Sequence, residues 1–219
     1  MFTFSSLNRS LIALCATAAF AGFAFSDTCL YAAFPSQTQT LIPSKVTIHE
    51  RLYTFSNYFE IDSDVGHQGN LIKTKLALRT NYQYYNHMGQ HVSSAYLRLF
   101  SLGSLCTWAG VLDVYDDIGN RIGLIEGAVV TLLPSKFSLY GAQNELVGTA
   151  YMDHDSMGFT ISDAVNESKT IANFRRVFVK DVVDHWEITI NDPYAIDIRL
   201  VYSFGAFVLD NQNDFRVDD

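Results

Sequence analysis

IDIRLVYSFGAFVL, residues 196–209, is the segment of the sequence that says most about the fold. After Arg199 it is apolar on every side of a helical projection, and Asp210 closes the apolar run. The preceding Asp192-Pro193 pair supplies a capping carboxylate and a proline suited to a first helical turn. A helix that is apolar all round must be buried in protein or in a membrane. We therefore predict a buried helix over this segment.

Two other structures compete for the same residues. A helix of this length measures about 21 Å, which is short for the ~30 Å hydrocarbon core of a bilayer. A strand is compatible with the first residues, because apolar and charged side chains alternate from Ile196 to Leu200. We prefer the buried helix, since Ser203 and Gly205 suit close packing against strands.

Upstream of this segment, short apolar runs alternate with polar turns. From residue 45 onward apolar side chains recur at every second position, which is the period of a half-buried strand. Between the runs lie turns with glycine or asparagine, at residues 86–89, 116–120 and 141–144. About ten to twelve strands fit, which is enough to close a barrel. The alternating sets are Tyr53, Phe55, Phe59 and Ile61; Ile72, Thr74, Leu76 and Leu78; Phe137 and Leu139; Phe159 and Ile161; and Trp186, Ile188 and Ile190.

Composition supports a single globular domain with an acidic surface. Hydrophobic residues make up 48% of the 219 positions and charged residues 17%, so a sizeable core is feasible. Sixteen Phe and twelve Tyr against four Pro favour strands. The formal net charge is −8, and a field of that sign repels nucleic acid and anionic lipid at long range. We therefore expect no nucleic-acid partner.

Residues 1–26 have the features of a removable signal peptide. Arg9 is their single charged side chain, and Leu11–Phe25 is an uncharged run shorter than the ~20 apolar residues of a spanning helix. The run ends in small-x-small sequences, and we favour cleavage after Ser26. Residues 27–44 are expected to form a flexible tether, and residues 45–219 a single domain. The prediction is export to the periplasm or the extracellular space; a retained N-terminal membrane anchor is the alternative.

Cysteine usage agrees with export without establishing it. Cys15 lies in the signal segment, which leaves Cys29 and Cys106. These two can pair in an oxidising compartment or remain free thiols. No Cys-x-x-Cys sequence is present, so a thiolate metal site is not expected.

A set of short motifs runs in order through residues 52–212. They are Arg98–Gly103 (RLFSLG), Leu112–Gly119 (LDVYDDIG), Ile122–Gly127 (IGLIEG), Lys136–Tyr140 (KFSLY), Asp184–Ile188 (DHWEI) and the closing segment Asp192–Asp210. In this order they resemble the LURP-one-related proteins of the tubby C-terminal-like superfamily, which also contains the phospholipid scramblases. The resemblance implies a mainly β fold, a closed antiparallel barrel of approximately twelve strands around a central hydrophobic C-terminal helix. It implies the fold more firmly than any activity.

Two small basic clusters are candidate contacts for lipid phosphate. Lys73 and Lys75, with Arg79, form one, and Arg175 and Arg176 form the other. Tubby domains bind phosphoinositides, so the resemblance implies such contacts here. The simpler interpretation is that these side chains lie on the solvent-exposed face of a sheet. The acidic net charge agrees with this interpretation.

Two histidine clusters are candidates for metal binding. Asp153-His154-Asp155 is interpreted as a solvated turn, because adjacent strand residues point to opposite faces. His87 and His91 have the i, i+4 spacing of a helical zinc pair, but the sequence around them is that of a hairpin. We therefore predict no metal site and no cofactor.

A third cluster, Asp184-His185, resembles part of a hydrolytic triad. No positioned nucleophile accompanies it, and Trp186 is expected to fill the core. With no catalytic residue assigned, we expect an exported, non-enzymatic binding or scaffold protein whose protein or lipid partner is unknown. The alternative is a peripheral membrane protein that binds or redistributes phospholipid.

Overall fold

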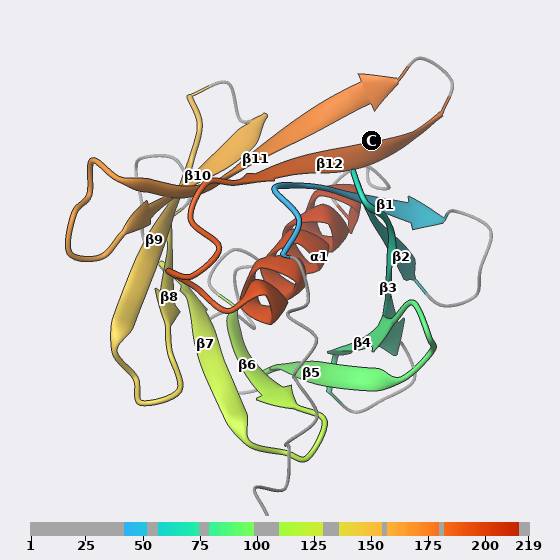
Figure 1. The fold of residues 1–219 in the computed structure, drawn as a ribbon, viewed down its shortest axis with the longest axis horizontal. Helices are drawn as coiled ribbons and strands as arrows, with labels where there is room; N and C mark the ends of the chain where they lie inside the picture. Colours follow the sequence, from blue (N-terminus) through green and yellow to red (C-terminus); the bar gives the residue numbers. More distant parts are fainter. Residues whose placement is uncertain are drawn as a thin grey trace, which may run out of the picture. The chain divides into compact units, whose positions relative to one another are not determined.

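The computed structural model describes residues 42–51, 57–74, 79–98, 110–128, 136–154, 157–179 and 182–214. They form twelve strands and one helix, α1 (Ile198–Asp214) (Figure 1). The first six strands are β1 (Lys45–Arg51), β2 (Tyr58–Ser63), β3 (Gly66–Thr74), β4 (Asn81–Asn86), β5 (His91–Leu97) and β6 (Val111–Asp116). The other six are β7 (Arg121–Gly127), β8 (Lys136–Tyr140), β9 (Leu146–Met152), β10 (Gly158–Asp163), β11 (Thr170–Val179) and β12 (Val182–Ile190).

The strands form one closed antiparallel barrel in which each strand pairs with its neighbours in sequence. The barrel closes between β1 and β12, where Ile48 lies opposite Trp186 and His49 opposite His185. Closure leaves no open sheet edge among the described strands, so their backbone groups are paired within the molecule. The expected barrel is confirmed.

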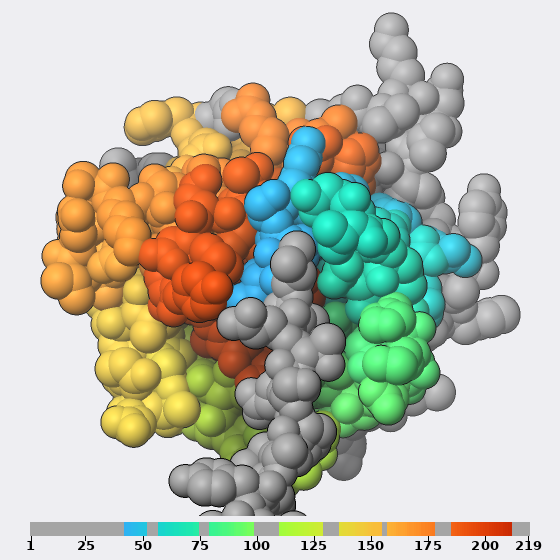
Figure 2. Space-filling model, viewed as in Figure 1, coloured from blue at the N-terminus to red at the C-terminus, as the bar shows by residue number. Residues whose placement is uncertain are grey.

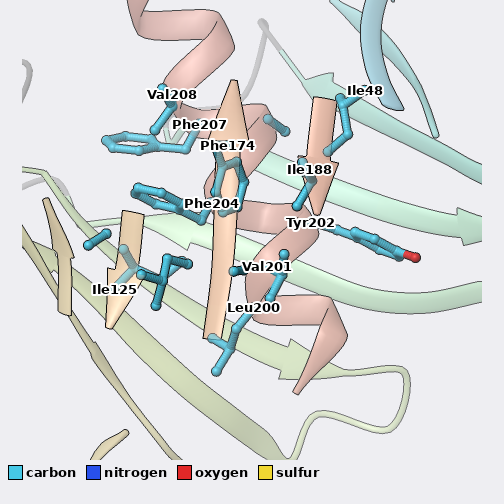
Figure 3. Close-up of a cluster of buried hydrophobic side chains, with 14 of the residues drawn as sticks. Ile48, Ile125, Phe174, Ile188, Leu200, Val201, Tyr202, Phe204, Phe207 and Val208 are labelled. Atoms are coloured by element: carbon cyan, nitrogen blue, oxygen red, sulfur yellow. The ribbon is translucent and has the colours of Figure 1, made fainter. Parts of the chain in front are cut away.

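Helix α1 runs through the centre of the barrel (Figure 1). Its apolar side chains contact the walls on all sides, and Figure 3 shows Phe204 and Phe207 beside Phe174 of β11. Residues 200–211 are all buried, as expected for a helix without a polar face. Each large side chain buried in this way contributes about 1.5–3 kcal/mol. The expected buried helix is confirmed, and the strand alternative is wrong.

The helix begins later than the sequence indicates. Asp197 is its N-terminal cap: the Arg199 backbone N–H donates to the Asp197 carboxylate at 2.9 Å. Asp192 instead accepts the Tyr194 N–H at 3.1 Å, which forms a separate turn ahead of the helix. The assignment of Asp192-Pro193 to the helix start is therefore wrong. An aspartate that accepts the backbone N–H two residues later stabilises a turn as well as a helix start. The sequence therefore does not distinguish Asp192 from Asp197 as the helix cap.

A cluster of aromatic rings surrounds the middle of α1. The Phe204 ring lies 5.2 Å from Phe137, 5.4 Å from Phe159 and 5.3 Å from Phe174, in edge-to-face geometry. Trp186 is fully buried, and its ring lies 5.9 Å from Phe159. The prediction that Trp186 fills the core is confirmed, as is the inward orientation of the alternating residues on β8, β10 and β12.

The alternation assigned to β3 is inverted. Leu71 is buried and faces the helix, whereas Ile72 is only half-buried on the outer side. Lys73 therefore shares the inner face with Leu71, opposite the buried Tyr82 of β4. A lysine can occupy that face because Asp210 of α1 supplies an internal counter-charge. Sequence periodicity alone does not reveal such a partner.

The three predicted turns are present. The 86–89 and 116–120 turns contain glycines with positive φ, Gly89 at 75° and Gly119 at 89°. In the third, Asn144 has a φ of 64°, a conformation that asparagine tolerates better than most residues. Each turn joins two paired strands, so the hairpin interpretation is confirmed.

Gly69 holds the β2–β3 pair in its bulged register. The register shifts after Ile61, which lies opposite Gly69, so that Asp62 lies opposite His67 and Gln68 is the extra residue. Gly69 has a φ of 146°, and a Cβ there would lie 2.1 Å from the Tyr85 carbonyl oxygen. Tyr84 packs on the same bulge and donates its hydroxyl to the Gln68 carbonyl at 3.1 Å. Burial raises the pKa of Tyr84 to about 12, so it remains a neutral donor at physiological pH.

We expect Gly69→Ala to be clearly more destabilising than Gly66→Ala. Gly66 also has a positive φ, 118°, but no atom lies within 4 Å of a Cβ there, so both changes incur backbone strain and only Gly69→Ala adds a clash. The clash should add roughly 1–3 kcal/mol to the unfolding free energy lost. Urea denaturation of both variants measures the difference; equal losses would mean that the bulge relaxes freely.

Candidate functional site

Because α1 occupies the described interior of the barrel, ligand sites must be sought on its outer wall. On the outer side of β6, Asp113 lies among arginines and is 8% exposed. Arg98 donates to its carboxylate through Nε and Nη2, both at 2.7 Å, and Arg79 lies 3.5 Å away. The hydrogen bonds that Arg98 donates to Asp113 raise the pKa of Arg98. This bidentate pair fixes the outer wall around β5 and β6.

Arg79 is held in one orientation beside this pair. Its Nε donates to the Leu97 carbonyl at 2.7 Å and its Nη2 to the Tyr96 carbonyl at 3.2 Å. The guanidinium carbon lies 5.1 Å from the centroid of the Tyr96 ring, within the range of a cation–π contact. Two backbone carbonyls and an aromatic ring therefore hold the Arg79 side chain in place.

Next to Arg79 lies an open cleft of about 360 Å³. Tyr96 and Tyr115 form an aromatic wall, with ring centroids 6.0 Å apart in edge-to-face geometry. His91 closes one side, held by Ser94 at 2.8 Å and by the Tyr85 ring at 5.5 Å. The residues that line the cleft are Arg79, His91, Ser94, Tyr96, Tyr115, Asp116, Asp117 and Gly119.

The rim of the cleft is acidic. Asp116 accepts the backbone N–H groups of Ile118 at 3.1 Å and Asn120 at 2.7 Å, which shapes the turn. Desolvation raises the pKa of Asp116, but these hydrogen bonds and that of the Asn120 amide outweigh it, and the net shift is downward. Asp117 beside it is exposed. Aromatic faces next to two carboxylates are suited to a positively charged group.

The candidate lipid-phosphate residues do not form one surface. Lys73 faces inward and its Nζ lies 2.6 Å from Asp210, with the lysine side chain 14% exposed. Lys75 is outside the described residues. Arg175 is exposed and lies opposite Glu187 of β12, whereas Arg176 lies opposite the buried Trp186 and is half-buried. Strands β2, β1 and β12 separate β3 from β11.

The remaining sequence candidates are dispersed. Asp153 accepts a hydrogen bond from Thr160 at 3.2 Å, and Asp155 lies outside the described residues. His87 lies in a turn, while His91 belongs to the cleft.

Of the third cluster, His185 lies on the outer face opposite His49, and nothing is described of the Asp184 side chain. Cys29 and Cys106 are outside the described residues, as are the signal segment and the tether up to residue 41.

Sequence reasoning missed the cleft as a site. Its lining comes from residue 79, from β5, from the end of β6 and from the turn after β6, which are separated in sequence. The sequence patterns place Arg79 with Lys73 and Lys75, and His91 with His87, and so do not bring Arg79 and His91 together. The motif Leu112–Gly119 was the available signal, because it contains both Tyr115 and the acidic rim.

Among the described residues, no helix combines the length and apolar character needed to span a bilayer.

Comparisons with known proteins bear on the fold. No family model matches the sequence, and no curated protein matches it. Among solved structures, the fold is similar to the X-ray structure of the Arabidopsis thaliana protein AT5G01750, with a TM-score of 0.51. The match has 12% sequence identity and covers 78% of this chain and 93% of the Arabidopsis chain. At this level of identity the similarity concerns the fold alone.

Proposed function

We propose that this protein is an exported, non-enzymatic binding or scaffold protein of the LURP-one-related kind, and that its outer cleft binds a positively charged group of a partner protein. The observation that carries the proposal is the cleft itself: a fixed aromatic wall beside an acidic rim, on a barrel whose described interior is filled by α1. A filled interior leaves the outer wall for recognition.

Electrostatics supports a basic partner. The cleft carries Asp116 and Asp117 against Arg79, and the chain as a whole has a net charge of −8. Long-range attraction of this sign accelerates encounters with positively charged partners. A lysine or arginine side chain lying against Tyr96 or Tyr115 would form a cation–π contact with the ring and an ion pair with a carboxylate of the rim.

Export rests on sequence features alone. The uncharged run Leu11–Phe25, with Arg9 before it and small residues at its end, supports a secretory signal. A peripheral role at the membrane is the alternative location for the same fold. Of the four candidate lipid-phosphate residues, Arg175 and Arg176 remain its main support, because Lys73 is bound to Asp210.

We expect a short poly-lysine peptide to bind, and Asp117→Asn to weaken that binding. Removing one exposed carboxylate from the rim should cost about 1 kcal/mol, roughly fivefold in Kd. Asp64→Asn is the matched control, since Asp64 is also an exposed turn aspartate but lies between β2 and β3. Fluorescence anisotropy of the labelled peptide measures both variants. Equal weakening by Asp117→Asn and Asp64→Asn would contradict binding at the cleft. Tighter binding of poly-glutamate than of poly-lysine would contradict the proposal that the cleft prefers a positive charge.

Flotation with vesicles separates the lipid alternative from the protein-partner proposal. On the proposal, the protein does not float with phosphatidylcholine vesicles or with vesicles containing phosphatidylserine or phosphoinositide. Headgroup-dependent flotation that falls with salt and is lost in Arg175→Glu would favour the phospholipid function instead.

A further inference from the structure

Four polar side chains gather on the outer faces of β1, β2 and β3, on the opposite side of the wall from the core. They are His49, Glu60, Asp62 and His67. His49 lies directly opposite Glu60 in the β1–β2 register, and Asp62 lies opposite His67 in the β2–β3 register. Figure 2 shows β1 (blue) and β2 with β3 (teal) next to one another on the molecular surface. The pairing of β1 with β2 and of β2 with β3 therefore brings the four residues together on one stretch of the wall.

The ligand atoms within this cluster are close. His49 Nε2 lies 2.7 Å from Glu60 Oε2 and 3.8 Å from Asp62 Oδ2. The ligand atoms of these three residues all lie within 4.8 Å of one another. Two ligands of a tetrahedral zinc ion are about 3.3 Å apart, given bond lengths of about 2.0–2.2 Å. The distance from His49 to Glu60 is shorter than the ligand–ligand distance around zinc, and the distance from His49 to Asp62 is longer. Small side-chain rotations therefore suffice to surround an ion.

The β2–β3 bulge adds His67 to the cluster. With Gln68 as the extra residue, His67 is placed opposite Asp62. Its Nδ1 lies 2.8 Å from Asp62 Oδ1, on the carboxylate oxygen that does not face His49. This is the arrangement in which a second residue orients a carboxylate ligand of a metal.

The cluster also contains more acceptors than its donors satisfy. Asn70 lies opposite Glu60 in the register, and its side-chain amide oxygen is buried without a hydrogen-bond partner in the described part of the chain. Arg51 forms an ion pair with Glu60 and lies over the Tyr58 ring, and its side chain is 60% exposed. The carboxylates of Glu60 and Asp62 and the amide oxygen of Asn70 can therefore accept a further positive charge.

We propose that His49, Glu60 and Asp62 bind a divalent transition-metal cation of the zinc type, and that His67 is a positioning residue for Asp62. Imidazole nitrogen with carboxylate oxygen suits zinc, copper or nickel rather than calcium or magnesium, which require all-oxygen shells. Three protein ligands leave a fourth position for water or for a ligand atom from a partner. Because the three ligands stand on the paired strands β1 and β2, their backbone positions are set before the metal binds.

Zinc titration of the full chain against a chromophoric chelator tests the proposal. One saturable site is expected, together with a rise in melting temperature on adding zinc and none on adding calcium or magnesium. His49→Ala and, as a more conservative change, Asp62→Asn should abolish both effects. His87→Ala is the matched control, because His87 is an exposed turn histidine, and it should bind zinc as the parent does.

Two further variants probe the neighbours of the site. His67→Ala should weaken zinc binding by about 10–100-fold. His67→Asn, whose amide nitrogen can replace Nδ1, should restore much of the affinity, and a merely structural histidine would not show that rescue. Arg51→Gln removes the cation that competes for Glu60, so it should tighten binding.

Cobalt substitution gives the deciding spectrum. Cobalt bound by nitrogen and oxygen ligands lacks the thiolate charge-transfer band that Cys15, Cys29 or Cys106 would produce. The proposal is overturned if no saturable site is found, if His49→Ala binds zinc as tightly as the parent, or if the cobalt complex shows thiolate ligation. In those cases the cluster is a hydrogen-bonded histidine–carboxylate network.

Discussion

Phe204→Asp is expected to unfold most of the protein at room temperature. Phe204 is fully buried in α1, and its ring contacts Phe137, Phe159 and Phe174 from three separate strands. Loss of a buried Phe ring costs about 3–5 kcal/mol, and a carboxylate without a partner in that position adds several more. The sum approaches the whole stability of an ordinary domain, about 5–15 kcal/mol.

The measurement is near-ultraviolet circular dichroism together with urea denaturation. The parent should show a fixed aromatic signal and a single cooperative transition, and Phe204→Asp should show neither. Phe204→Leu keeps an apolar side chain and should retain the transition at reduced stability. Val165→Asp places the same charge on a side chain that is 96% exposed and should change stability by less than about 0.5 kcal/mol. A cooperative Phe204→Asp protein would mean that α1 is not the core of the barrel.

The same contacts bear on any model in which α1 inserts into a membrane. Leaving the barrel would expose the aromatic cluster on β8, β10 and β11 and would break the contacts of Asp210 with Lys73 and Tyr82. Contact with lipid through side chains of the outer wall, such as Arg175, keeps these interactions, whereas insertion of α1 into a membrane would break them. The flotation experiment with Arg175→Glu distinguishes those routes.

Apolar patterning predicted the strands and the buried helix, and the family resemblance of the motifs implied their arrangement as a closed barrel around that helix. An all-round apolar segment of one helix length requires a surrounding wall, and the alternating runs on β8, β10 and β12 supply one. Where prediction failed, a polar partner from elsewhere decided the structure. Lys73 faces inward because Asp210 lies there, and Asp197 rather than Asp192 caps the helix because the chain first makes another turn.

The candidate sites were harder to predict than the fold. His49, Glu60 and Asp62 form a cluster only when β1 and β2 pair in one register, and His67 joins it only through a one-residue bulge. A shift of one residue would turn these side chains to the other face, so composition and spacing cannot reveal the cluster. Its only sequence signal is the alternation of Glu60 and Asp62 with the buried Phe59 and Ile61.

Asp210→Ala is the second change for which we expect a large effect. The Asp210 carboxylate is 3% exposed in the final turns of α1, and Lys73 Nζ donates to it at 2.7 Å. It also accepts the Tyr82 hydroxyl at 2.6 Å and the Asn57 amide at 2.8 Å. Removing the carboxylate takes the counter-charge from a nearly buried ammonium and removes an acceptor from the Tyr82 hydroxyl and the Asn57 amide. We expect a loss of about 3–5 kcal/mol in the free energy of unfolding.

A double-mutant cycle separates the ion pair from its surroundings. Lys73→Met alone leaves the carboxylate with two neutral donors and should also be strongly destabilising, whereas Lys73→Met with Asp210→Asn removes both charges and keeps an acceptor for Tyr82 and Asn57. The double variant should therefore be more stable than the sum of the single losses by about 0.5–3 kcal/mol, measured by urea denaturation.

Glu187→Gln is the control for the cycle, because the Lys45–Glu187 pair is exposed and 3.1 Å apart, and its loss should cost less than about 1 kcal/mol. Strict additivity of Lys73→Met and Asp210→Asn would show that the two charges do not stabilise each other. The inward lysine would then be held by packing of its alkyl chain against the wall, and the end of α1 would be fixed by Tyr82 and Asn57 alone.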